Sequence, residues 1–130
     1  MKNDVEKTIR QLLEMGYSAE EILTEAEYII EKDRLLATAI MEQIDGVDGW
    51  TYISENEKLP IRFIEQFQNK LNWKVLSLYQ DLTEELIELH KNEVDWFYIF
   101  MKQDISGEFI KAHIEVIRTS IERVLQLISL

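Results

Sequence analysis

Two histidines are the side chains of this sequence best suited to proton transfer or metal binding. His90 and His113 lie 23 residues apart, and Glu84, Glu85 and Glu88 precede the first of them. An imidazole titrates near neutral pH and ligates transition metals, and a nearby carboxylate would complete an acid–base pair. One alternative is therefore an enzyme that uses Glu84, Glu88 and His90.

A structural interpretation of the same residues is preferred. Both histidines stand where an internal repeat, described below, has Phe67, so this position favours a partly buried ring. Acids at i, i+1 and i+4 of a helix commonly face water. The chain has no cysteine, and it shows no Ser/His/Asp arrangement, glycine-rich phosphate loop or zinc-ligand spacing. We therefore expect a non-enzymatic protein with no cofactor and no metal.

The charge of the chain is strongly negative and unevenly distributed. The net charge is −11, and residues 18–48 carry nine acids against Lys32 and Arg34, whereas residues 96–130 carry four charges of each sign. Nucleic-acid binders usually have the opposite sign, so direct nucleic-acid binding is not expected. The acidic stretch is either a solvated face or a surface for a basic protein partner. The candidate residues of that acidic face are Glu20, Glu21, Glu25, Glu27, Glu31 and Asp33.

Composition favours a helical protein. One proline and four glycines in 130 residues are few, which suits long helices better than hairpin-rich sheets. The N-terminus is too charged for a signal peptide, and no apolar segment approaches 18 residues. We expect a single cytoplasmic domain without membrane contact.

An internal repeat organises the second half of the chain. Trp50, Trp73 and Trp96 are spaced by 23 residues and divide it into units 50–72, 73–95 and 96–118. Each unit is predicted to form a short helix that begins at tryptophan and a second helix, and neighbouring units would supply the missing core. Residues 36–49 resemble a degenerate earlier unit. Two further repeat columns are Phe63, Leu86 and Phe109, and Ile64, Ile87 and Ile110.

The predicted fold is all-α. It comprises an N-terminal helical hairpin over residues 1–35, the degenerate unit, the three repeats over residues 50–118 and a capping helix over residues 119–130. In the hairpin, Ser18 and Glu21 form a capping-box pattern, and Ile22, Ala26, Ile29 and Ile30 share one helical face.

The last unit carries surplus apolar side chains. Phe97, Phe100 and Met101 stand where the sister units have mostly polar residues, and Leu127 and Leu130 fall off the apolar stripe of the capping helix. These residues either pack beneath the capping helix or line an exposed patch. Such a patch would mark a dimer or partner interface.

Two segments resemble a family of short tryptophan-led repeats of the type D-W-x-x-I-S-x-x-Q-x-L-S-E-E-F-I. They are DWFYI…QDISGEFI and NWKVLSLYQDLTEELI, and the resemblance covers about residues 36–118. The resemblance implies a protein of Gram-positive bacteria, their phages or large DNA viruses. The chain departs from the pattern at Pro60 and Phe100, and its third unit ends in Arg118-Thr119 without Asp-Trp.

The leading functional hypothesis is a non-enzymatic protein–protein interaction module. Its most specific form is a phage-type inhibitor, acting in the bacterial cytoplasm, whose acidic helix imitates a phosphate backbone and occupies a basic, nucleic-acid-handling host protein. The alternative is a self-associating module that uses the aromatic patch near Phe97 and Phe100.

Overall fold

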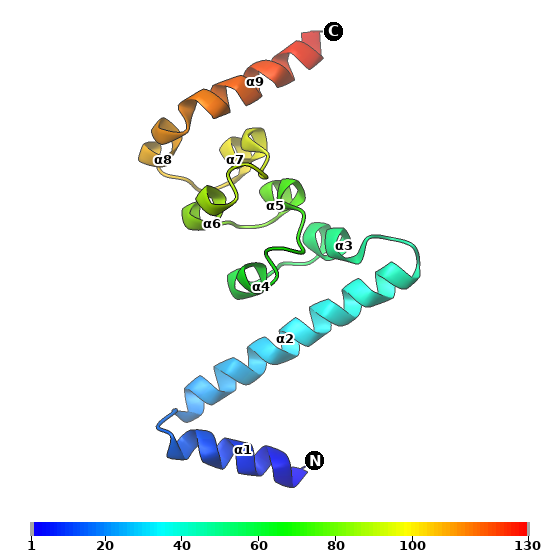
Figure 1. Cartoon of the computed structure of the whole chain (residues 1–130), viewed down its shortest axis with the longest axis vertical. Coiled ribbons are helices and arrows are strands. Elements are labelled where there is room, and N and C mark those ends of the chain that lie inside the picture. Colours follow the sequence, from blue (N-terminus) through cyan, green and yellow to red (C-terminus); the bar gives the residue numbers. More distant parts are fainter. Residues whose placement is uncertain (1, 130) are drawn as a thin grey trace. The chain divides into compact units, whose positions relative to one another are not determined.

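The computed structural model describes residues 2–129, and within that range every side chain except those at positions 2, 3 and 5. The described chain is entirely helical and contains no strand (Figure 1), which confirms the all-α prediction. Its helices are α1 (Lys2–Glu14), α2 (Ala19–Ile44), α3 (Gly49–Asn56), α4 (Ile61–Gln66), α5 (Trp73–Tyr79), α6 (Glu84–Leu89), α7 (Trp96–Lys102), α8 (Gly107–Ala112) and α9 (Ile114–Ser129).

The chain divides into two compact units, Met1–Thr38 and Ala39–Leu130. We call them the N-terminal unit and the repeat unit. The division falls inside α2, close to residue 35, where the sequence predicted the end of the hairpin.

In the N-terminal unit, two helices are joined by a glycine turn. Gly16 has φ +97°, and the Tyr17 amide returns to the Leu12 carbonyl at 3.1 Å, which closes the end of α1. The Ser18 hydroxyl accepts from the Glu21 amide at 3.0 Å, and the Glu21 carboxylate accepts from the Ser18 amide at 3.2 Å. The predicted capping box is therefore present at the start of α2.

Helix α2 is longer than the sequence analysis proposed. It continues through residues 36–44, beyond residue 35, where the hairpin was predicted to end. This stretch holds no glycine or proline and is rich in Leu, Ala, Ile and Met, so nothing stops the helix. It ends at Ile44, just before Gly46, whose φ is +87°, and the Val47 amide donates to the Glu42 carbonyl at 3.0 Å.

The repeat unit is built from pairs of short helices that follow the 23-residue spacing. Helix α3 contacts α5, α5 contacts α7 and α7 contacts α9, so the tryptophan-bearing helices form a continuous stack that ends on α9 (Figure 1). Side chains that precede each tryptophan cap these helices: Asp48 accepts from the amide of Trp50, and Asn72 and Asp95 each accept from two amides of the following turn.

The core of the stack comes from the repeat columns. Ile53, Leu76 and Ile99 are completely buried, as are Phe63 and Ile64 in the first unit. In the last unit the equivalent residues Phe109 and Ile110 are only half-buried, and α8 has no buried residue. The reason is that no further repeat unit follows α8 and supplies a second helix to pack on it.

Helix α9 closes the stack and differs from the predicted cap in two respects. It starts at Ile114 rather than at residue 119, because the third unit lacks the Asp-Trp pair that would restart a helix. Glu122 takes the register position of the buried Ile99 and is exposed, so α9 is a capping helix and not a fourth unit.

Candidate interaction surfaces

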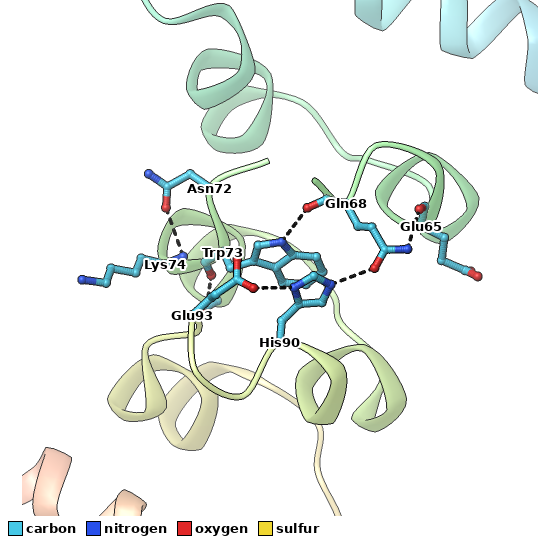
Figure 2. Close-up of polar contacts among 8 residues, drawn as sticks. Glu65, Gln68, Asn72, Trp73, Lys74, His90 and Glu93 are labelled. Atoms are coloured by element: carbon cyan, nitrogen blue, oxygen red, sulfur yellow. Dashed lines mark hydrogen bonds and ion pairs between the residues drawn. The ribbon is translucent and has the colours of Figure 1, made fainter. Parts of the chain in front are cut away.

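His90 is a structural residue within the stack. Its ring lies 3.6 Å from the ring of Trp73 at an interplanar angle of 10°, and the side chain is almost completely buried (Figure 2). Its Nδ1 lies 3.2 Å from the Glu93 carboxylate and its Nε2 lies 2.9 Å from the Gln68 amide oxygen. Both ring nitrogens are engaged, which agrees with the predicted packing role of this column.

His113 repeats the same arrangement in the next unit. Its ring stacks on Trp96 with centroids 4.6 Å apart, and its Nε2 lies 2.6 Å from the Glu88 carboxylate. In the first unit Phe67 packs on Trp50 at 5.5 Å. In all three units, therefore, the ring of a second side chain packs against the tryptophan.

The residues of the enzymatic alternative bind different partners. Glu84 accepts from the amide of Ser106 at 2.8 Å and contacts its hydroxyl at 3.2 Å, whereas Glu88 contacts His113 and Lys91. None of the described hydrogen bonds joins His90 to Glu84 or Glu88. Among residues 2–129 no group of three His, Asp or Glu side chains could hold a metal ion.

A buried amide in the second and third units forms a clamp that the sequence analysis missed. The Gln80 Nε2 donates to the carbonyls of Ser54 and Glu57, both at 2.7 Å, and its Oε1 accepts from the Leu59 amide at 2.9 Å. Gln103 makes the equivalent three bonds one unit later, to Ser77, Gln80 and Leu82. The available signal is a glutamine seven residues after both Trp73 and Trp96.

The candidate acidic residues all lie on α2, but not on one face. At about 100° per residue, Glu20, Glu27 and Glu31 share one stripe and Asp33 points to another side of the helix. Glu21 also serves as the capping-box partner of Ser18. The Arg34 guanidinium, bonded to Glu31 at 2.7 Å, lowers the pKa of that carboxyl below its ordinary value.

The N-terminal unit exposes large apolar side chains among these acids. Leu23 is 59% exposed and Ile30 is 69% exposed on α2, and Ile9 and Leu13 are about half exposed on α1. The predicted apolar face of α2 is thus only partly covered: Ile22 and Ala26 are half-buried, whereas Ile29 and Ile30 are exposed. Two helices alone cannot bury all the apolar side chains that they carry, so part of their apolar faces stays exposed.

A groove of about 460 Å³ lies between α7 and α9 of the repeat unit. We call it the α7/α9 groove. Its walls include Phe97, Tyr98, Val124 and Leu127, and the charged side chains that line it are Lys74, Asp95 and Arg123.

The apolar patch predicted near the C-terminus is only partly assembled in this groove. Phe97 and Leu127 line it together, whereas Phe100 and Met101 are exposed on α7 and are not among its lining residues. Leu130, the fifth predicted member, lies outside the described residues. The alternative of full burial beneath the capping helix is wrong for Phe100 and Met101, which are 39% and 57% exposed.

No helix between residues 2 and 129 is long and apolar enough to cross a membrane. Comparison with known proteins adds no relative: no family model, no curated protein and no solved structure matches this chain. The resemblance to tryptophan-led repeats therefore stays a prediction from the residues.

Proposed function

We propose that this protein is a non-enzymatic interaction module whose N-terminal unit binds a basic protein partner. The observation that carries the proposal is the combination, on α2, of exposed Leu23 and Ile30 with the acidic stripe of Glu20, Glu27 and Glu31. Exposed apolar residues rimmed by charge are typical of protein-binding surfaces. The repeat unit serves as the rigid scaffold in this proposal.

The partner chemistry follows from the charge of the surface. A stripe of carboxylates steers a basic protein to the surface, and the apolar side chains then supply the buried contact. In its most specific form, the proposed module is a phage-type inhibitor that covers the nucleic-acid-binding surface of a host protein. The tryptophan-led pattern of the sequence motivates that form, and the acidic stripe supports it.

Site-specific photocrosslinking tests the proposal. A photoreactive phenylalanine analogue replaces Leu23 or Ile30, and the full-length protein is exposed to nuclease-treated bacterial lysate. Tyr79, which is exposed on α5, provides the control position. We expect one dominant basic protein to be crosslinked from Leu23 and Ile30, less efficiently as salt rises, and not from Tyr79.

Charge variants complete the test. Reversal of Glu20, Glu21, Glu25 and Glu27 to lysine should abolish capture, whereas reversal of the exposed Glu65 and Glu85 in the repeat unit should not. Equal crosslinking from Tyr79, or unchanged capture by the reversed α2 variant, would show that α2 is not the binding surface.

A further inference from the structure

The α7/α9 groove has the chemistry to receive an acidic amphipathic helix. Phe97 and Leu127 provide apolar walls, and Lys74 and Arg123 bring positive charge to the same groove. The acid among its lining residues, Asp95, is engaged at the start of α7, where it accepts from the Phe97 and Tyr98 amides. Neither of these cations forms an ion pair within residues 2–129. Figure 2 shows the Lys74 ammonium extending away from the labelled side chains around His90.

The chain itself carries such a helix. On α2, Leu23 and Ile30 lie two turns apart on one side, and Glu27 lies next to both, at i+4 from the first and i−3 from the second. All three are exposed, and no ion pair of Glu27 is found in the described part of the chain. We call these residues the α2 strip.

The charges of the chain favour binding of the α2 strip of one copy in the α7/α9 groove of another copy over contact between the two α2 helices. Contact between two α2 helices would bring the acids of residues 18–48 together, which is unfavourable. Residues 96–130, which contain α7 and α9, carry as many basic as acidic side chains. The α2 strip therefore meets complementary charge and apolar surface in the groove, and not on another α2.

We propose that the α2 strip of one copy binds in the α7/α9 groove of a second copy, with Glu27 facing Lys74 and Arg123. The contact joins two different surfaces, so it is a head-to-tail contact, and a single such contact leaves one strip and one groove open. The inference rests on the proposed function in taking α2 as a binding surface. It names one partner of that surface, a second copy of this chain.

Sedimentation of the purified protein tests the contact without any other protein. We expect the mass to rise above that of the monomer with increasing concentration at low salt, and to fall back at raised salt. The reversals Glu27→Lys and Arg123→Glu should each weaken association by about tenfold or more, and the two together in one chain should restore most of it. The reversals Glu85→Lys and Lys58→Glu are matched controls away from both surfaces.

A mixing experiment identifies the head-to-tail geometry. One variant loses the strip through Leu23→Gln and Ile30→Gln, and another loses the groove through Arg123→Gln and Leu127→Gln. Each variant alone should be monomeric with unchanged helix content by circular dichroism. Mixed, the intact groove of the first should bind the intact strip of the second and give a dimer but no larger species.

Three results would overturn the inference. They are a wild-type protein that stays monomeric at every concentration at low salt, association that persists in either variant, and folded variants that give no dimer when mixed. Because only the purified chain is present, these results leave the proposed basic partner untouched, and failure to crosslink that partner in lysate leaves self-association untouched.

Discussion

The Gln103 side chain donates from Nε2 to the main-chain oxygen of Gln80 at 2.7 Å, so the clamp residue of the second unit is itself held by the clamp of the third. In the same way, Gln80 Nε2 donates to the main-chain oxygen of Glu57, the residue of the first unit that is equivalent to Gln80. Adjacent units are thus joined by buried hydrogen bonds as well as by apolar packing. Buried donors and acceptors must be paired, so the clamps specify the register of the stack.

Replacement of Gln80 by leucine should destabilise the protein by roughly 2–4 kcal/mol, because the Leu59 amide and two carbonyls would lose their partner in a buried site. The free energy of unfolding in urea, followed by circular dichroism, measures the loss. Gln126→Leu, at an exposed position of α9, is the control and should change stability little. Equal stability of the two variants would contradict a structural role for the clamp.

His90→Phe should cost much less stability than His90→Ala. Phenylalanine keeps the ring on Trp73, as Phe67 does on Trp50, and loses only the bonds to Gln68 and Glu93. We expect a loss of about 1 kcal/mol for phenylalanine. For alanine, which leaves a cavity, we expect roughly 2–4 kcal/mol. Urea unfolding monitored by tryptophan fluorescence gives both values, and equal losses would show that the hydrogen bonds, rather than the ring, hold this position.

Removal of one whole unit should leave a folded protein. Deletion of residues 73–95 joins Asn72 to Trp96, where Asn72 can cap the helix, and brings Gln103 into the register that Gln80 has in the intact chain. We expect a cooperative urea transition with a smaller slope, because less surface is buried.

The matched control deletes residues 73–92 and so removes most of the unit but breaks the register. That protein should not unfold cooperatively, because the columns that form the core no longer align. If both deletions behaved alike, the 23-residue spacing would not determine how these helices stack.

The ion pair of Glu31 with Arg34 should contribute a small, pH-dependent stability to α2. The hydrogen bond from Arg34 lowers the pKa of Glu31 from its ordinary value of 4.5, so the contribution is present above the unfolded pKa and is lost as pH falls through the folded value. Because the pair is exposed to solvent, we expect less than about 0.5 kcal/mol. The difference in unfolding free energy between wild type and Glu31→Gln should disappear between about pH 5 and pH 3, and a difference that grew on acidification would contradict this sign.

Much of this architecture could be predicted from residue types and spacing. The capping box of Ser18 and Glu21, the glycine end of α1 and the ring position of His90 and His113 all depend on short-range rules, and the structure confirms them. The continuation of α2 to Ile44 was not predicted, although residues 36–44 contain good helix formers and no glycine or proline that would end the helix.

The candidate surfaces were harder to predict, because exposure depends on what neighbouring elements cover. The sequence placed Phe97, Phe100 and Met101 in one patch, yet only Phe97 faces the α7/α9 groove. Lys74 and Arg123 were not singled out, since they lie far apart in the chain and meet only when α5, α7 and α9 stack.

The sequence by itself determined the helical class, the 23-residue spacing and the acidic charge of α2, because these depend on local propensity, periodicity and composition. Only the tertiary structure decided that the Gln80 and Gln103 side chains clamp the preceding unit, that α9 is a cap and not a fourth unit, and that Leu23 and Ile30 stay exposed. These outcomes depend on which surfaces remain after the helices pack, and contacts between residues distant in the chain determine that.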